Sequence, residues 1–220
     1  MDWRVVVDRL PELAGGLLQT LLLCVISAVA ALAIGAGVTL MQLRGVSALR
    51  WLASAYTALC LGLPLLILIY ILFYALPEYG LILSSRVVGV LALAIYYGPY
   101  FAEVMRAAVQ AIAPGQFEAA SSIGLSGWRT ASRILLPQAL PLMLPSMAGL
   151  TIGMVKDSAL LSVVSVPEFM FFAKQAVSDT YAPIEIYVAV ALTYWFLSSV
   201  CSVVARWMEG RLSAYRLAQA

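Results

Sequence analysis

Charged residues inside the apolar stretches are the strongest candidates for chemistry in this sequence. Lys156 and Asp157 stand side by side, and Ser158 follows them. Adjacent residues on a helix point about 100° apart, so this lysine and aspartate do not face each other and each needs another partner. One interpretation is a zwitterionic ligand, whose ammonium meets Asp157 and whose carboxylate meets Lys156, with the Ser158 hydroxyl close by. The alternative is that both charges pair with other helices or lie exposed at a membrane face.

A second charged pair, Glu103 and Arg106, follows the apolar run 87–102. Residues at positions i and i+3 share a helix face, so these two side chains can form an ion pair. Because a charge at the bilayer centre costs at least ~2.5 kcal/mol, one interpretation is a neutralised structural pair near the end of a span. The other is that one of the two meets a substrate or a gate, with Glu103 as the candidate for the substrate contact.

A proline interrupts another apolar run, in the sequence Leu61-Gly62-Leu63-Pro64. A proline inside a helix leaves a carbonyl group unbonded and usually kinks the helix. The kink either serves packing or opens a cavity at mid-membrane. The second interpretation makes Leu63 a candidate substrate contact.

The remaining composition argues against several other functions. Histidine is absent, which removes the usual proton shuttle and the commonest metal ligand, and the three cysteines form no metal-spaced cluster. The chain contains neither G-x-S-x-G nor H-E-x-x-H, and its net charge of +2 implies no nucleic-acid footprint. We therefore predict no catalytic residue, no metal site and no nucleic-acid partner. Tyr96, Tyr97 and Tyr100 are interpreted as core or interface anchors rather than ligands.

Membrane-spanning helices are the elements that must position these residues. The chain is 63% hydrophobic and 11% charged, whereas soluble domains carry roughly 25% charged residues. A spanning helix needs ~20 apolar residues, and the uncharged runs predict five spans. These runs are 13–43, 51–77, 87–102, 134–155 and 186–205. The third is short, and its helix is expected to continue through Glu103 and Arg106 to about residue 112.

The spans are expected to form a single membrane domain. Residues 1–12 show no cleavable signal pattern and are predicted to form a surface segment, followed by a membrane core over 13–208 and a tail over 209–220. Residues 156–185 mix apolar and charged positions. We interpret them as a broken helix or short packed helices on one side of the membrane.

Basic residues predict the orientation of the five spans. One side collects Arg44, Arg50, Arg106, Arg129, Arg133, Arg206, Arg211 and Arg216, and the other collects Arg4, Arg9, Arg86 and Lys174. The side richer in basic residues is expected to be cytoplasmic. The N-terminus is then outside, and the C-terminus and the loop before the fourth span are in the cytoplasm.

That loop contains a polar island from Glu118 to Pro137. Ala119 and Ala120 supply small surfaces after Glu118, whose carboxylate would be favoured by the helix dipole in a first turn. Pro114-Gly115 is expected to end the preceding helix. The sequence predicts a short helix over 118–127, too polar to span the membrane and offered to a partner at the membrane face.

The island resembles the EAA loop of the membrane subunits of ABC importers. The matching positions are Glu118, Ala119, Ala120, Gly124, Ile134, Leu136 and Pro137. Further stretches over most of residues 13–208 are similar to the polar amino-acid uptake permeases. These stretches are GGLLQTLLL at the start of the first span, FYALP near residue 77, YFAE with Arg106, PGQ before Glu118, and Lys156-Asp157-Ser158-Ala159-Leu160. One departure is clear, because Leu61-Gly62-Leu63-Pro64 stands where family members often have R-G-T-P.

The resemblance implies an all-α fold like that of the type I ABC importers, with a cytoplasmic coupling helix between the third and fourth spans. It implies a permease in a bacterial inner membrane that moves a polar or cationic amino acid, or a related opine or compatible solute, into the cytoplasm. Residues implied to couple to the ATPase are Glu118, Ala119, Ala120, Gly124, Leu125, Ser126 and Gly127. It also favours Asp157 as a lining residue of the substrate pocket.

The partners implied by the resemblance are a cytoplasmic ATPase dimer, an external solute-binding protein, a second identical or similar permease, and membrane lipid. The chain has no G-x-x-x-x-G-K-[ST] phosphate loop, so ATP and Mg²⁺ are expected on the separate ATPase, and this chain is expected to bind no cofactor and to be no enzyme itself. The alternative is a self-sufficient secondary carrier or channel. Such carriers commonly contain internal repeats, and none is visible in five spans.

Overall fold

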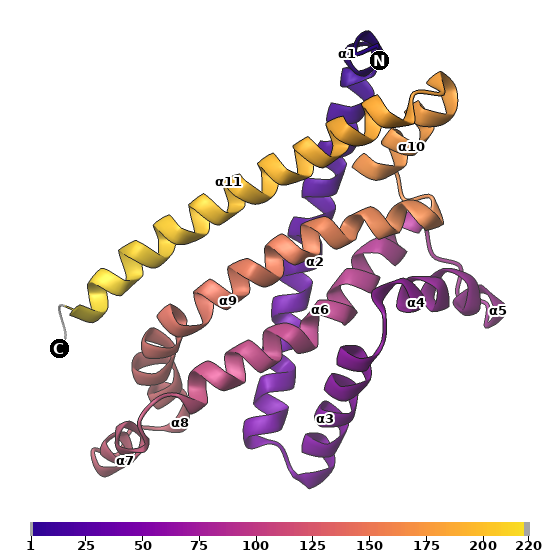
Figure 1. The fold of residues 1–220 in the computed structure, drawn as a ribbon. Helices are drawn as coiled ribbons and strands as arrows, with labels where there is room; N and C mark the ends of the chain where they lie inside the picture. The colour runs from indigo at the N-terminus through magenta and orange to yellow at the C-terminus, as the bar shows by residue number, and fades with distance from the viewer. Residues whose placement is uncertain (1, 218–220) are drawn as a thin grey trace.

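The structure, a computed structural model, describes the backbone of residues 2–217 and the side chains up to residue 208, and it is helical throughout this range apart from the connections (Figure 1). The α-helices are α1 Arg4–Asp8, α2 Leu10–Arg44, α3 Ser47–Gly62, α4 Leu65–Tyr70, α5 Leu76–Glu78, α6 Ser85–Gln110, α7 Pro114–Ser122, α8 Gly127–Thr130, α9 Leu136–Asp157, α10 Phe169–Thr180 and α11 Pro183–Leu217. The π-helical turns Ile71–Ala75 (η1) and Ala131–Leu135 (η2) continue α4 and α8, and the 3₁₀-helix Ser158–Val164 (η3) follows α9.

In the part of the chain that the structure describes, four helices are long and apolar enough to cross a membrane: Leu10–Arg44, Ser85–Gln110, Gly127–Val164 and Pro183–Met208. The second predicted span, residues 51–77, is not one helix, because α3 and the helix Leu65–Glu78 meet at 107°; it makes a fifth span only if this bent pair crosses the membrane as one unit. Leu63 has the extended backbone (φ −103°, ψ 133°) that a following proline favours. Since Pro64 has no N–H to continue the helix, the predicted kink is a full break.

The centre of the bundle is the contact between α2 and α6, the most extensive in the chain. A Cβ placed on Gly35 of α2 would lie 2.9 Å from the Gly98 carbonyl oxygen and 2.9 Å from the Phe101 Cβ. Glycine therefore allows the two backbones to approach closely, as small residues do at helix interfaces in membranes. Ala31 and Ala92 on the same helices are fully buried.

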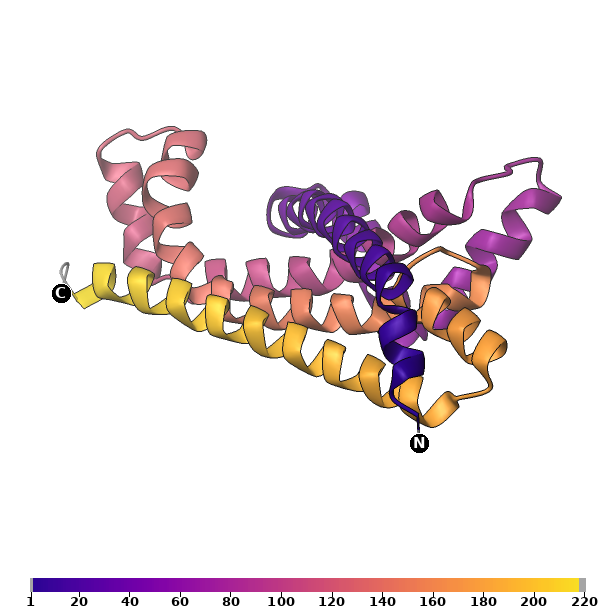
Figure 2. The same cartoon turned by 90° about the horizontal axis from the view of Figure 1, so that it is seen from above.

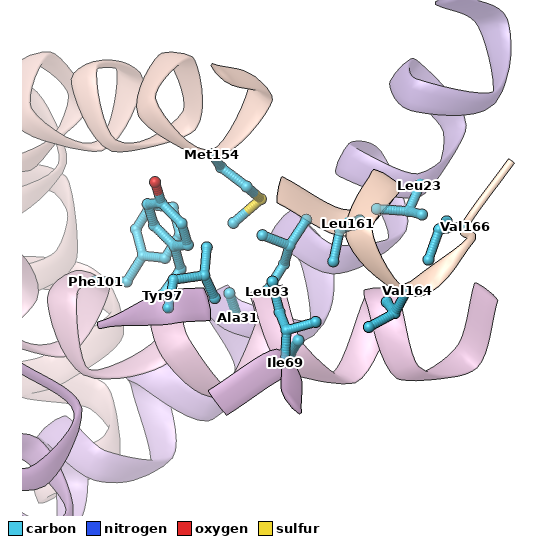
Figure 3. Close-up of a cluster of buried hydrophobic side chains, with 12 residues drawn as sticks. Leu23, Ala31, Ile69, Leu93, Tyr97, Phe101, Met154, Leu161, Val164 and Val166 are labelled. Atoms are coloured by element: carbon cyan, nitrogen blue, oxygen red, sulfur yellow. The ribbon is translucent and has the colours of Figure 1, made fainter. Parts of the chain in front are cut away.

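The main apolar cluster lies where η3 packs against α4 and α6, and Leu23 and Ala31 of α2 belong to it (Figure 3). Leu93, Met154 and Leu161 are fully buried in it. Figure 3 shows the Tyr97 ring in the same cluster, with its oxygen directed toward the helix that carries Met154. This cluster fixes the end of α9, and with it the position of Asp157.

The two ends of the bundle differ in their contents. Figures 1 and 2 show α1 and α10 near the N-terminus, whereas α7, α8 and the last turns of α11 lie at the opposite end. Residues 158–180 form two short packed helices, which confirms that part of the interpretation of this stretch. α2 begins at Leu10, inside the predicted surface segment, and the predicted tail beyond 217 and the side chains of Arg211 and Arg216 lie outside the described residues.

Candidate functional site

The polar island forms a helix, but its bounds differ from those predicted. Pro114 does not end the preceding helix, which ends at Gln110; it is the first residue of α7. A proline suits this position because the first N–H of a helix has no intrahelical partner. The prediction that Glu118 lies in the first turn is therefore wrong, since α7 runs from Pro114 to Ser122 and Glu118 is in its middle.

Gly124 ends α7 in a turn that few other residues could form. Its φ is +71°, in the left-handed region that favours glycine. Its N–H donates to the Ser121 carbonyl at 3.0 Å, and the Leu125 N–H donates to the Ala120 carbonyl at 3.1 Å. These two bonds satisfy the last carbonyls of the helix in the manner of a Schellman motif. Gly127 then begins α8, so it belongs to the next helix rather than to the predicted 118–127 helix.

The coupling segment, defined here as residues 114–127, presents most of its surface outward. Ala120 is only 1% exposed and faces the protein, whereas Glu118, Ala119, Ser126 and Gly127 are exposed. Apolar side chains are exposed beside them. They are Phe117, Ile123, which is 74% exposed, and Trp128, which is 79% exposed. Exposed apolar side chains at the end of a bundle mark a surface suited to a partner.

The coupling segment is also tied to two of the spans. The Gln138 amide on α9 donates to the Gln116 side-chain oxygen on α7 at 3.4 Å. Arg44, the last residue of α2, packs on the other end, because a Cβ on Gly127 would lie 3.1 Å from the Arg44 Nη1. The coupling segment therefore contacts α2 through Gly127 and α9 through Gln116.

Asp157 is held at the end of α9 by a tyrosine of α6. Tyr97 Oη donates a 2.7 Å hydrogen bond to Asp157 Oδ2, and the carboxylate is half-buried. Gly153 makes room for this contact, since a Cβ there would lie 3.2 Å from the Tyr97 oxygen. The rings of Tyr96 and Tyr100 lie within 6 Å of the Tyr97 ring. Asp157 thus sits beside an aromatic and hydroxyl-bearing surface.

The neighbours of Asp157 point elsewhere. Lys156 is exposed and forms no ion pair among the described residues, which agrees with the expectation that it does not pair with Asp157. Ser158 is fully buried, and its hydroxyl donates to the Val155 carbonyl at 2.8 Å. Leu63 is half-buried at the α3–α4 break. The side chains of Lys156, Ser158 and Leu63 therefore do not converge with Asp157 on one site.

Glu103 and Arg106 form the predicted ion pair within α6, and Arg106 also donates to the Gln110 side chain at 3.1 Å. They line a hollow of about 490 Å³ between α2, α3 and α6, together with Gln42, Leu43, Ser54, Thr57, Ala58, Leu61 and Gln110. The Gln42 side chain donates to the Thr57 hydroxyl at 3.2 Å, while its buried Oε1 has no protein partner. A hollow with a carboxylate, a guanidinium and amides can accommodate a small polar solute that carries both charges.

Two predicted substrate residues, Asp157 and Glu103, lie at different heights along α6: Asp157 contacts Tyr97, and Glu103 lines the hollow. Glu103 lies six residues beyond Tyr97, which is about 9 Å along the helix axis. Tyr97 is buried as the sequence predicted for a core anchor, but its bond to Asp157 was not predicted. Gln42 was missed as a candidate, although a glutamine in an apolar run places a polar group inside a span. Among the described residues no three His, Cys, Asp or Glu side chains gather as metal ligands.

The chain is similar to permeases over nearly its whole length. Residues 30–214 match the model of the family described as binding-protein-dependent transport system inner membrane component. YckA of Bacillus subtilis, a probable amino-acid ABC transporter permease, is 30% identical and covers 96% of this chain and 94% of its own length. GlnM of the same organism, a probable glutamine ABC transporter permease, is 32% identical, with 96% and 98% covered.

The chain is also similar to ABC transporter chains of known structure. A chain of an amino acid ABC transporter crystallised with histidines has a TM-score of 0.89 at 30% identity, covering 96% of this chain and 99% of that one. An inward-facing chain of the MetNI methionine ABC transporter has a TM-score of 0.77 at 19% identity, covering 91% and 96%, which supports the fold alone. The expected type I importer fold is confirmed. The chain therefore belongs to the family of inner-membrane permease components of binding-protein-dependent transport systems.

Proposed function

We propose that this chain is the permease subunit of an ABC importer that moves a polar or cationic amino acid, or a related opine, into the cytoplasm. Relatives named for amino-acid solutes support this substrate class, including a probable glutamine permease, an L-cystine permease, an arginine permease and a nopaline permease. The charges inside the bundle fit such solutes. Asp157 can meet an ammonium or guanidinium group, and the Glu103–Arg106 hollow offers both signs of charge.

The observation that carries the proposal is the coupling segment. It is exposed, ends in the glycine turn and contacts both α2 and α9. In the proposed complex it docks on a cytoplasmic ATPase, which holds ATP and Mg²⁺, through Glu118, Ala119, Gly124, Leu125, Ser126 and Gly127. Ala120, predicted as a docking residue, is buried and instead packs α7 against its own bundle. Closure of two ATPases then moves the spans as rigid bodies.

The remaining partners follow from this arrangement. A second permease, identical or similar, completes the translocation path, and an external binding protein delivers the solute. The proposal places α7 and the C-terminus in the cytoplasm and the N-terminus outside. A cysteine in place of Ser126 should then react with an impermeant thiol reagent only from the cytoplasmic side, and one in place of Tyr79 only from outside. Labelling with the opposite polarity would overturn the orientation.

The substrate role of Asp157 is tested by Asp157→Asn, which keeps the shape and removes the charge. Uptake from the loaded binding protein into proteoliposomes should weaken, and the lost interaction could cost about 2–5 kcal/mol if the pair is desolvated. Asp8→Asn, which changes an exposed aspartate of α1, is the matched control. Co-purification of the ATPase should be unchanged in both variants. Uptake by Asp157→Asn with the same solute dependence as the parent would remove this residue from the site.

ATPase association separates this function from the alternative. A self-sufficient carrier or channel would transport its solute without an ATPase and would not retain one on purification. Transport by the purified chain alone in liposomes would therefore contradict the proposed function.

A further inference from the structure

A buried carboxylate lies between two spans and takes no part in the transport scheme above. Glu168 precedes α10 and is 0% exposed. Within the described part of the chain no ion pair joins it to a lysine or arginine. A carboxylate buried without a cation is costly unless hydrogen bonds compensate for its lost hydration. Glu168 must therefore be held by donors of another kind.

Those donors are the first amides of α10 and one hydroxyl of α2. The Phe171 N–H donates to Glu168 Oε1 at 2.7 Å, and the Met170 N–H donates to Oε2 at 2.9 Å. Thr20 Oγ1 donates to Oε2 at 3.3 Å and accepts from the Phe169 N–H at 3.0 Å. Glu168 and Thr20 thus cap α10 together, and we call these two residues with the three amides the Glu168 clamp.

α2 is shaped to receive this helix end. Gly16 lies four residues before Thr20, on the same helix face. A Cβ on Gly16 would lie 2.7 Å from Phe172 Cδ2 and 3.0 Å from Phe169 Cα, so only glycine admits α10 at this distance. By contrast, nothing lies within 4 Å of a Cβ on Gly15. The approach of α10 is therefore specific to one face of α2.

The clamp is connected to Asp157 by a short, packed segment. Asp157 is bonded to Tyr97 at one end of this segment, and Glu168 is bonded to Thr20 at the other. Between them η3 buries Leu161 and Val164 in the main apolar cluster. A segment fixed at both ends transmits a displacement of α10 to Asp157.

The environment of Glu168 makes its charge sensitive to pH. Burial raises the pKa of Glu168 to about 7 from the usual value of 4.5, although the amides of Met170 and Phe171 and the Thr20 hydroxyl favour the charged form. Among the described residues, the titratable groups that face it are Tyr194 of α11 and Cys24 of α2. Since an undocked, hydrated Glu168 would lose its proton at lower pH, protonation favours the docked form.

We propose that Glu168 and Thr20 form a proton-sensitive clamp, which docks α10 on α2 and thereby positions Asp157 for the solute. Glu168 acts through Asp157 and is a positioning residue. The transport part of this inference rests on the proposed function, but the docking part concerns the permease alone.

Hydrogen exchange of the Phe169–Phe171 amides in the purified complex tests the docking. In the parent protein their protection, corrected for intrinsic exchange, should be on the order of tenfold greater at pH 5.5 than at pH 8. Glu168→Gln removes the titrating group and keeps one acceptor oxygen, so protection should be the same at both pH values. The matched control is Glu78→Gln, which removes an exposed carboxylate and should behave as the parent does. Equal protection of the parent amides at the two pH values would overturn the clamp.

Uptake from the loaded binding protein tests the positioning. The apparent KM of the parent should rise from pH 5.5 to pH 8, whereas that of Glu168→Gln should stay constant. Thr20→Val removes the shared hydroxyl and should raise the KM roughly tenfold with faster amide exchange, and Thr20→Ser should restore both. If the Glu168→Gln complex does not assemble, the comparison of Thr20→Val with Thr20→Ser tests the positioning instead. A parent complex that imports no solute contradicts the proposed function, while a flat pH profile with intact transport contradicts only this inference.

Discussion

Two short helices connect spans in this chain, and they are capped in opposite ways. α7 begins at a proline, which removes one unpaired N–H, and its last carbonyls are bonded by the local turn at Gly124, whose φ is positive. α10 begins at Glu168, and its first amides depend on that residue and on Thr20 of the distant α2. In the described range α7 buries one residue, whereas α10 buries Phe169, Ala173 and Ala176. A helix with local caps can present its surface to a partner, whereas a helix with a shared cap becomes part of the bundle.

The largest expected effect breaks the local cap of α7. Gly124→Asp places a side chain at φ +71°, which costs ~1–2 kcal/mol for residues other than glycine, and adds a charge to the docking surface. Transport should be abolished and ATPase co-purification reduced, with normal membrane insertion. Glu118→Lys should act in the same direction through its reversed charge. Gly80→Asp, at a glycine with φ +81° outside the coupling segment, is the control and should retain the ATPase. Full uptake and ATPase retention in both variants would refute the coupling assignment.

The second prediction uses the shared cap of α10 and concerns stability against pH. A carboxyl whose pKa is raised on folding to about 7 stabilises the fold below its unfolded pKa, and this contribution is lost as pH rises toward 7. Thermal unfolding of the purified protein should therefore show a decline in stability between about pH 4.5 and pH 7, of roughly 2–3 kcal/mol. Glu168→Gln should remove this part of the slope. An unchanged decline of stability with pH in Glu168→Gln would mean that other titratable groups cause it.

A smaller effect is expected from the close approach of α10 to α2. Gly16→Ala introduces a Cβ 2.7 Å from Phe172 and should destabilise the fold by ~1–3 kcal/mol, through overpacking. Gly15→Ala is a matched control one residue away, with no atom within 4 Å of the new Cβ. Denaturation midpoints in one detergent would measure both. Equal midpoints for the two variants would show that α10 is not held at this distance.

The smallest effect concerns the surface attachment of α10. Arg9 pairs with Asp179 at 3.1 Å and with Glu12 at 3.0 Å, and these carboxylates are well exposed. Arg9→Gln should cost less than about 1 kcal/mol, because exposed ion pairs are weak and screened by salt. The difference from the parent should shrink further in high salt. A loss as large as that of Gly16→Ala would mean that surface charge, rather than the buried cap, docks α10.

The sequence by itself determined the class of protein, the four long apolar helices and the position of the polar island. Apolar length decides whether a helix can cross a membrane, and the Glu103–Arg106 pairing follows from helical spacing alone. The pairing is present, and Pro64 breaks the helix where the sequence predicted a bend. These features are local in the chain, so no distant contact was needed to predict them.

Only the tertiary structure decided which polar groups meet. Tyr97 with Asp157, Arg44 against Gly127, and Thr20 with Glu168 join residues that are 60 or more positions apart. The predicted helix over 118–127 was wrong for a local reason, since a proline can begin a helix as readily as it can end one. Asp157 and Ser158 are neighbours in sequence, yet their side chains point to different places. The Ser158 hydroxyl bonds to the Val155 carbonyl of the preceding turn, whereas the Asp157 carboxylate reaches Tyr97 of α6. Packing between helices, which no local pattern records, sets these directions.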